Sequence, residues 1–241
     1  MGVYDNLSMI SYSSDNEKLF GSKMNILLDL DSTVICSLDN NELKNFPKKY
    51  NDEFIHWDMN NYYRIFERPY LQLFLDYLFS NYNVSIFTAA DKDYALFIAD
   101  NIILKKPGRK LKYLFHGYHS DLSEKYYKSP KDLRILWDVF NLKTKFRPCN
   151  TLILDDLDEV YDNNPYNSIA VEKFEILDIN GKFNKEMLHD NFLLKCIPII
   201  ENLTNKMLSN KCLCSKGYTN ICKYQIYNNH IEIGKPLLEL R

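Results

Sequence analysis

The chain has 241 residues, of which 46% are hydrophobic and 26% are charged, as in an ordinary globular protein. Its formal net charge of -2 gives no overall attraction to nucleic acid or to an anionic membrane, so we predict neither as a partner. No segment is apolar for long enough to span a bilayer, and the first residues lack the pattern of a signal peptide. Six cysteines are too few for a disulfide scaffold at this length, so we expect reduced thiols and an intracellular protein, cytoplasmic or nuclear.

Short apolar runs that end in polar residues predict the strands of a buried sheet. The first run follows a polar leader, residues 1–23, which we expect to be weakly ordered. Runs of this kind are typical of strands that are covered on both faces, as in a parallel sheet. The predicted strands, in chain order, cover residues 24–28, 84–87, 113–115, 151–154 and 169–171.

Helical periodicity separates these strands. Apolar residues recur at helical spacing over residues 71–78, 133–140 and 193–203, and in the first two cases the stretch begins after a proline. Pro198 lies inside the third stretch and is expected to kink or break that helix. Strands that alternate with helices predict an α/β fold, with a parallel sheet and helices on both of its faces. Beyond this region, alternation on either side of Asn228-Asn229 predicts a hairpin.

Polar side chains follow three of the predicted strands. Asp29 and Asp31 follow the first strand, Thr88 follows the second, and Asp155 and Asp156 follow the strand at residues 151–154. In a parallel sheet the ligand site lies at the carboxyl ends of the strands, so these side chains should converge. Buried carboxylates are costly unless a metal or charged ligand compensates them, and Mg2+ prefers oxygen ligands.

This set of side chains suits phosphoryl chemistry. One carboxylate can attack phosphorus, and a second can protonate the leaving oxygen and then activate water. The hydroxyl of Thr88 and a lysine can bind the phosphoryl oxygens. Taken singly, an Asp-x-Asp-x-Thr string is often a turn or helix cap, and paired aspartates are often a solvated strand end. The order of the three strand ends favours the catalytic interpretation.

Five segments carry a resemblance to a known family. Residues 26–34 resemble the first motif of haloacid-dehalogenase-like (HAD-like) phosphatases, and residues 68–70 with 85–90 resemble the branch that dephosphorylates the C-terminal domain of RNA polymerase II. Residues 131–133 and residues 151–169 are similar to the later motifs of that branch, with the spacing of its ubiquitin-like-domain-containing member. The resemblance implies a HAD-like (Rossmannoid) domain over residues 24–208. It also implies a small insertion at residues 101–130, between the second and third motifs, that shapes the substrate entrance. Residues 209–241 remain an extension of unknown role.

The resemblance also implies roles for the motif aspartates. Asp29 corresponds to the nucleophile and to a Mg2+ ligand. Asp31 corresponds to the general acid and base, with its backbone carbonyl on the metal. Asp156 corresponds to a direct metal ligand, and Asp155 to a residue that ligates through water or orients Lys131.

Two residues are expected to bind the phosphoryl group, Thr88 and Lys131. Lys128 lies one turn earlier and is an alternative to Lys131, but the Lys-x-Leu-x-x-x-Trp pattern favours Lys131. The substrate that the resemblance implies is phosphoserine or phosphothreonine in a protein segment. A small molecule or a nucleic-acid end is the alternative within the enzyme class, and a catalytically silent binding module is the alternative outside it. The sequence does not indicate an oligomeric state.

Two further patterns have competing interpretations. The basic run at residues 105–112 can steer a phosphorylated partner, although a solvated loop and strand edge is the better explanation. His116 and His119 have a spacing that can ligate a metal on a helix. Gly117 and the loop that we expect around it favour a structural or surface role for both histidines.

Overall fold

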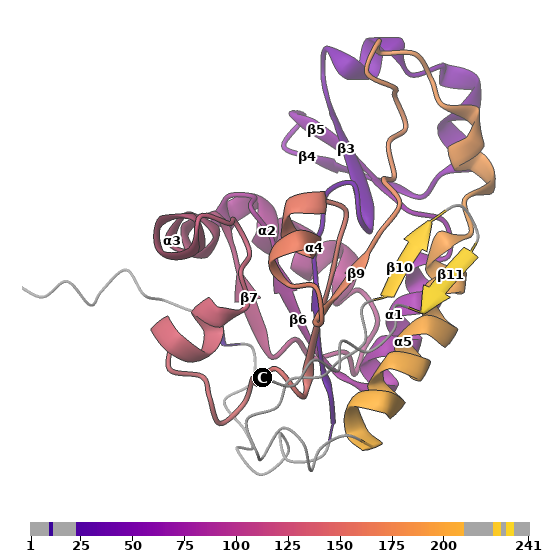
Figure 1. Ribbon diagram of the computed structural model, residues 1–241. Coiled ribbons are helices and arrows are strands. Elements are labelled where there is room, and N and C mark those ends of the chain that lie inside the picture. The colour runs from indigo at the N-terminus through magenta and orange to yellow at the C-terminus, as the bar shows by residue number, and fades with distance from the viewer. Residues whose placement is uncertain (1–9, 12–22, 210–223, 228–229, 234–241) are drawn as a thin grey trace, which may run out of the picture.

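The computed structural model describes residues 10–11, 23–209, 224–227 and 230–233 (Figure 1). Its centre is a six-stranded sheet with the strand order β1-β7-β6-β2-β8-β9. All neighbours in this sheet are parallel except β1, which pairs antiparallel with β7 at one edge. The strands are β1 (Ile10–Ser11), β2 (Asn25–Leu28), β6 (Asn83–Phe87), β7 (Tyr113–Phe115), β8 (Thr151–Asp155) and β9 (Ser168–Ala170).

The five predicted strands are therefore confirmed, with ends that differ by one residue at most. Every residue of β2, β6 and β8 is buried, which explains why these strands read as unbroken apolar runs. Within β2 the faces alternate: Ile26 and Leu28 join one hydrophobic core, and Leu27 joins another on the opposite face.

Helices cover both faces, as predicted. Apolar residues of α1 (Leu71–Asn81), α2 (Lys92–Ile98) and α5 (Phe192–Ser209) belong to the core that contains Ile26. α3 (Gly117–Tyr127), α4 (Asp158–Asn163) and the π-helical turn η5 (Ile135–Val139) contribute to the core that contains Leu27. A second π-helical turn, η4 (Ala99–Ile103), extends α2.

Two helix predictions need correction, the length of the helix at residues 133–140 and the break at Pro198. The stretch at residues 133–140 contains only the single π-helical turn η5, which is closed by the hydrogen bond from the N–H of Phe140 to the carbonyl of Ile135. Pro198 does not break α5, which runs on to Ser209. Pro198 has no N–H to donate to the carbonyl of Leu194, and because this proline is on the exposed side of the helix, water can donate there instead.

A second, antiparallel sheet was not predicted. It has the order β3-β5-β4 and is inserted between β2 and α1, with β3 at Ile35–Asp39, β4 at His56–Met59 and β5 at Tyr63–Glu67. The short helices η2 (Glu42–Asn45), η3 (Lys48–Glu53) and η6 (Lys185–His189) accompany it, and Phe46, Phe54, Phe66 and Phe174 form its separate core. In Figure 1 this sheet stands above the main one, on the side to which β2 leads.

The remaining segments bear on the expected domain limits. Residues 101–130 contain β7 and α3, which belong to the main sheet and its helical layer, and their role as a substrate entrance stays a prediction. Of the predicted leader, residues 10–11, as β1, and Lys23 are described. The predicted C-terminal hairpin is confirmed as β10 (Tyr224–Tyr227) and β11 (His230–Ile233), and β10 lies beside β9 (Figure 1).

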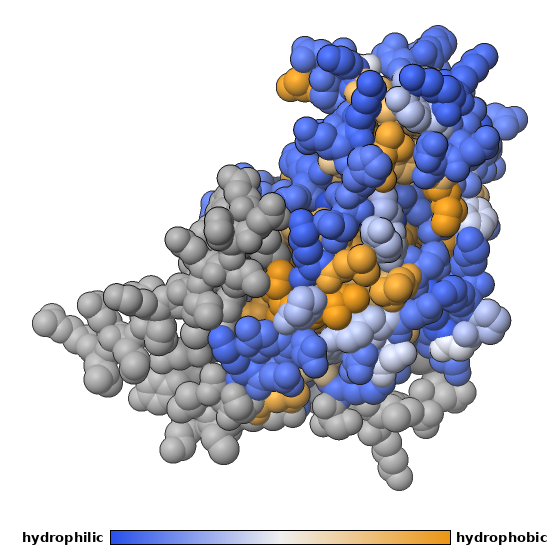
Figure 2. All heavy atoms as spheres, turned by 90° about the vertical axis from the view of Figure 1, so that its right-hand side faces the viewer, coloured by the Kyte–Doolittle hydropathy of each residue, from blue (hydrophilic) through white to orange (hydrophobic). Residues whose placement is uncertain are grey.

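The surface is mainly polar on the side where α5 lies in Figure 1. Figure 2 shows this side as largely hydrophilic, with apolar groups gathered in the middle of the view. None of the helices in the described part of the chain has the length and apolar character that a bilayer crossing requires.

Candidate active site

Three aspartates meet where β2 and β8 end. The two strands pair in register, with Leu28 opposite Leu154, so Asp29 and Asp155 occupy equivalent places on neighbouring strands. Carboxylate oxygens of Asp29, Asp155 and Asp156 all lie within 4.8 Å of one another. The expected convergence of these strand ends is therefore present in the structure.

Lys131 lies between two of these aspartates. Its Nζ donates to Oδ1 of Asp29 at 2.6 Å and to Oδ2 of Asp155 at 2.7 Å, and all three side chains are buried. Burial alone would lower the pKa of Lys131, but the charges of Asp29 and Asp155 outweigh it and hold that pKa above its ordinary value. Lys131 therefore carries a positive charge at neutral pH.

The backbone around Lys131 is fixed by side chains from two other elements. Asn164, at the end of α4, donates to the carbonyl of Lys131 and accepts from the N–H of Leu133. The hydroxyl of Ser123, from α3, accepts from the N–H of Asp132. These contacts satisfy the polar backbone groups of residues 131–133, which hold this segment in a turn before η5. Lys128 is exposed at the end of α3, so the structure places Lys131, and not Lys128, beside Asp29.

Thr33 joins two of the aspartates. Its hydroxyl lies 3.1 Å from Oδ2 of Asp29 and 3.2 Å from Oδ1 of Asp156. The buried guanidinium of Arg68 donates to the carbonyl of Thr33 and pairs with Asp190, which holds this loop in place. The sequence analysis assigned no role to Thr33 or to Arg68, although Thr33 is the last residue of the Asp-x-Asp-x-Thr string.

The cluster carries more negative than positive buried charge. Burial and the neighbouring charge of Asp29 raise the pKa of Asp155 to about 7, and the same two causes raise the pKa of Asp156. Lys173 adds a more distant cation, 3.7 Å from Asp156 and half exposed. A hard divalent cation with oxygen ligands would compensate this excess, so Asp29, Asp155 and Asp156 suit Mg2+.

Asp31 lies apart from this cluster and faces a different partner. Its Oδ1 accepts a hydrogen bond of 2.5 Å from the hydroxyl of Tyr94, which also contacts Ser37. Burial, reinforced by the charge of Asp29 and opposed by the Tyr94 hydrogen bond, raises the pKa of Asp31 to about 6. A carboxyl group with that pKa can both give and take a proton near neutral pH.

An open hollow of about 280 Å³ adjoins Asp31. Its lining includes Tyr63 from the antiparallel sheet and Tyr94 from α2. The hollow gives a substrate access to the Asp31 carboxyl group. Sequence reasoning missed Tyr94, because nothing in the periodicity of α2 shows that its hydroxyl reaches an aspartate.

Thr88 is buried directly after β6, which is the neighbour of β2 in the sheet. It therefore lies at the end of the sheet where β2 also ends. Its hydroxyl accepts from the N–H of Ala90. Gly117 packs against this turn: its N–H donates to the carbonyl of Ala90, and a Cβ at Gly117 would lie 2.9 Å from the carbonyl oxygen of Ala89. The loop expected around Gly117 is in fact the start of α3, which can approach the Thr88 turn only because residue 117 is glycine.

His116 and His119 have a structural role at this helix end. The N–H of His116 donates to Nδ1 of His119, and the ring of His119 packs edge-on against Phe115 and Phe140. Because His119 is fully buried among rings, this pair caps α3 and packs the core.

A parallel α/β sheet with clustered aspartates and a buried lysine at the carboxyl ends of its strands is typical of a HAD-like domain. The family model of the NLI interacting factor-like phosphatases matches residues 24–210, and the chain belongs to this family. The chain is 39% identical, over 171 residues, to the CTD phosphatase-like protein of Invertebrate iridescent virus 6, a match that covers 68% of this chain and 93% of the relative. The corresponding protein of Invertebrate iridescent virus 3 is 37% identical over 174 residues, with 68% of this chain and 90% of the relative covered.

Among solved structures, the chain is similar to that of Fcp1, an essential RNA polymerase II CTD phosphatase. The TM-score is 0.55 at 18% sequence identity, and the match covers 82% of this chain and 66% of that one. At this identity the match shows the fold. The expected HAD-like fold and the resemblance to the CTD phosphatase branch are thereby confirmed.

Proposed function

We propose that the chain is a Mg2+-dependent phosphatase that forms an aspartyl-phosphate on Asp29. The observation that carries the proposal is the placement of Lys131, a buried cation bonded to Asp29 within a cluster of three aspartates. Membership of a phosphatase family supports hydrolysis of a phosphoric monoester. The contacts of Asp29 support its role as the nucleophile.

The first half of the reaction transfers the phosphoryl group to Asp29. A carboxylate oxygen of Asp29 attacks phosphorus, the bond from phosphorus to the ester oxygen breaks, and Asp31 gives its proton to the departing oxygen. The contacts from Thr33 and Lys131 fix the Asp29 carboxylate, so little reorientation precedes the attack. The raised pKa of Asp31, about 6, leaves part of that group protonated near neutral pH.

The second half releases phosphate. Asp31, now ionised, takes a proton from a water molecule, the water oxygen attacks phosphorus, and the bond to Asp29 breaks. Free phosphate leaves, and Asp29 and Asp31 return to their starting states. Tyr94 keeps the Asp31 carboxylate directed toward the hollow through both halves.

The phosphoryl group and the metal would be held by the remaining motif residues. Lys131 and the hydroxyl of Thr88 would bind phosphoryl oxygens. Asp29, Asp156 and the backbone carbonyl of Asp31 would hold Mg2+ directly, and Asp155 would ligate through water while it orients Lys131. Bound Mg2+ neutralises charge on the phosphoryl oxygens.

The proposed substrate is phosphoserine or phosphothreonine in a protein segment that resembles the RNA polymerase II C-terminal domain. The two viral relatives are named CTD phosphatase-like proteins, which supports this choice. The open hollow beside Asp31, with tyrosines in its lining, suits an extended peptide better than an enclosed small molecule.

Hydrolysis assays with and without Mg2+ test the proposal. We expect turnover of an aryl phosphate and of phosphoserine peptides that is lost in Asp29→Asn and kept in Asp158→Asn, which changes an exposed aspartate nearby. Faster turnover of a nucleotide end or a sugar phosphate than of any phosphopeptide would overturn the substrate class. Phosphopeptide binding without turnover of any ester would overturn the proposal of an enzyme and would favour a binding module.

A further inference from the structure

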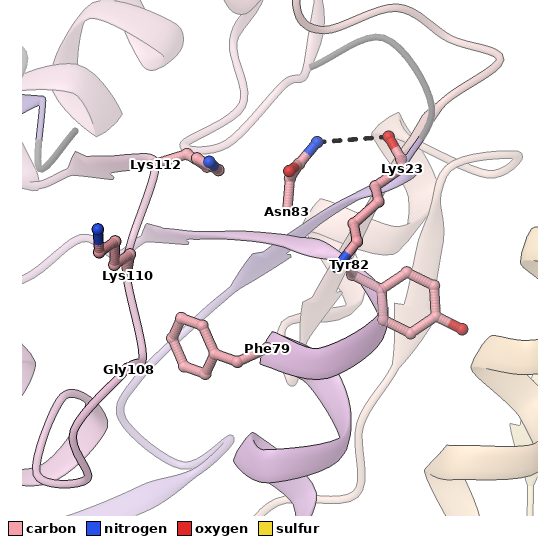
Figure 3. Close-up of a pocket in the computed structure, with 7 residues that line it drawn as sticks. All are labelled: Lys23, Phe79, Tyr82, Asn83, Gly108, Lys110 and Lys112. Carbon is pink, nitrogen blue, oxygen red and sulfur yellow. Dashed lines mark hydrogen bonds between the residues drawn. The ribbon is translucent and has the colours of Figure 1, made fainter. Parts of the chain in front are cut away.

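Cations that serve the candidate active site must lie at the carboxyl ends of the strands, where the aspartates meet. A separate hollow is lined by Lys23, Phe79, Tyr82, Asn83, Gly108, Lys110 and Lys112 (Figure 3). Because Lys23 precedes β2 and the basic run at residues 105–112 precedes β7, this hollow lies at the amino ends of the strands. Lys106 and Arg109 of the same run pair with Asp76 on α1. These cations therefore lie at the end of the sheet opposite to the aspartates.

Two other lysines do contact the aspartate cluster. Among the residues that the structure describes, Lys131 and Lys173 are the only ones that form ion pairs with its carboxylates. Lys131 is buried and bonds Asp29 and Asp155. Lys173 is about half exposed, and its Nζ lies 3.7 Å from Oδ2 of Asp156. Lys131 is therefore enclosed in the cluster, whereas Lys173 contacts it from the side that solvent reaches.

The backbone on both sides of Lys173 is fixed to the loop that carries Asp29. The N–H of Phe174 donates to the carbonyl of Ser32, in the Asp-x-Asp-x-Thr string, at 2.7 Å. The carbonyl of Glu172 accepts from the buried guanidinium of Arg68 at 2.8 Å. The side chain of Lys173 is the part of this segment that can move, so its ammonium group stays within reach of the aspartates.

Lys173 has acidic neighbours in the chain, but it pairs with Asp156. Glu172 and Glu175 lie one and two residues away, and in the described part of the chain neither forms an ion pair with Lys173. Oδ1 of Asp156 accepts only from the neutral hydroxyl of Thr33. In the metal-free protein Lys173 therefore supplies the positive charge that is paired with Asp156.

A metal ion would take this place from Lys173. Mg2+ binds carboxylate oxygens directly, and two cations that share one carboxylate repel each other. Because its side chain is half exposed, Lys173 can turn away from Asp156 toward solvent. A phosphate ester reaches the cluster from solvent and presents anionic oxygens, which are good acceptors for an ammonium group.

We propose that Lys173 exchanges partners during the catalytic cycle. Its ammonium group neutralises Asp156 in the metal-free protein, and it binds a phosphoryl oxygen of the substrate when Mg2+ is on Asp156. Lys173 thereby lowers the affinity for the metal and raises the affinity for the substrate. The proposal rests on the proposed function, because it takes Asp156 as a metal ligand and a phosphate ester as the substrate.

Calorimetric titration of the metal-free protein with Mg2+ at pH 8 tests the first half of the exchange. Lys173→Gln removes the charge and keeps a polar side chain, so the Kd for Mg2+ should fall by about three- to tenfold. Lys173→Arg keeps the charge and should stay within about twofold of the wild-type value. The control Lys182→Gln removes the charge of an exposed lysine further along the same segment and should also stay within about twofold. Circular dichroism should be the same for all four proteins.

Initial rates on a phosphoserine peptide at saturating Mg2+ test the second half. KM should rise by about three- to tenfold in Lys173→Gln, with a smaller change in kcat, because the lost contact binds the substrate. Lys173→Arg should restore KM to within about twofold of the wild-type value, and Lys182→Gln should leave it there. A lysine with only a structural role would not give this separation of KM from kcat.

Each half of the exchange has its own contrary result. If the wild-type protein binds Mg2+ and Lys173→Gln binds it no more tightly than Lys182→Gln does, the exchange is overturned. Tighter Mg2+ binding with an unchanged KM would overturn the substrate contact and leave Lys173 as a counter-ion only. A wild-type protein that neither binds Mg2+ nor hydrolyses the peptide would instead overturn the proposed function, so the two failures are distinguishable.

Discussion

The ammonium group of Lys131 lies 2.6 Å from the carboxylate of Asp29, and both side chains are buried. An isolated buried charge is costly, so each of these groups stabilises the charged state of the other. The pair also fixes the Asp29 carboxylate in the position from which it would attack. The same contact therefore serves the fold and the proposed chemistry, which makes Lys131 the first residue to test.

Lys131→Met keeps most of the side-chain volume and removes the charge. The change leaves Asp29 and Asp155 without their shared cation, so we expect the free energy of unfolding to fall by about 3–5 kcal/mol in metal-free protein. Urea denaturation measures this loss, and steady-state assays should show at least a hundredfold fall in kcat/KM. Lys128→Met changes an exposed lysine nearby and should leave both quantities nearly unchanged. Equal effects of the two variants would contradict the account.

Mg2+ binding should strengthen as the pH rises. The pKa of Asp155 is raised to about 7 and that of Asp156 is also raised, so in metal-free protein these groups hold protons that an arriving cation must displace. Apparent Mg2+ affinity should therefore increase from pH 5.5 to about pH 7 and level off above it. Calorimetric titrations in buffers of different ionisation enthalpy measure both the affinity and the released protons. An affinity that is independent of pH across this range would exclude these carboxylates as the ligands.

Tyr94→Phe removes the hydroxyl that donates to Asp31 and keeps the ring. Because that hydrogen bond lowers the pKa of Asp31, its loss should raise the pKa above about 6 and shift the pH profile of kcat upward. We also expect kcat to fall by about tenfold, since the Asp31 carboxylate loses its fixed orientation. Tyr126→Phe, which changes an exposed tyrosine, is the matched control. A lower kcat with an unshifted profile would show that Tyr94 has only a packing role.

Gly117→Ala places a methyl group 2.9 Å from the carbonyl oxygen of Ala89, so the turn after Thr88 or the start of α3 must move. We expect a destabilisation of about 1–3 kcal/mol and a higher KM for phosphoester substrates, because the Thr88 hydroxyl is displaced with its turn. Thermal unfolding and initial-rate assays measure these effects. Glu124→Ala, an exposed change on the same helix, should alter neither. An unchanged KM in a destabilised Gly117→Ala protein would show that Thr88 does not contribute to substrate binding.

The sequence predicts those residues of the site that directly follow buried strands. Asp29 and Asp155 follow unbroken apolar runs, and the rule that parallel strands share a carboxyl edge is enough to bring them together. Lys131 lies beside Asp29, but in a different local structure from the predicted one. It lies in a turn bound by Asn164 rather than at the start of a helix, and such a contact between distant segments leaves no periodic signal.

The antiparallel sheet escaped prediction for a different reason. No residue of β4 (His56–Met59) is fully buried, so this strand carries neither an apolar run nor a clean alternation. Its aromatic core depends on Phe174, more than a hundred residues away in the chain. Tyr94 was also missed, because its hydrogen bond to Asp31 depends on where α2 lies relative to that aspartate.

The central claim, that Asp29 becomes phosphorylated, can be tested by trapping. Enzyme, Mg2+ and an aryl phosphate are mixed, quenched in acid during the first turnover and treated with borohydride, which reduces an acyl phosphate to an alcohol. Peptide mass spectrometry then locates the reduced residue. The account predicts homoserine at position 29 in protein that has turned over substrate, and none in Asp29→Asn. Reduction at Asp31 or Asp155, or a burst of product with no reducible aspartate, would contradict it.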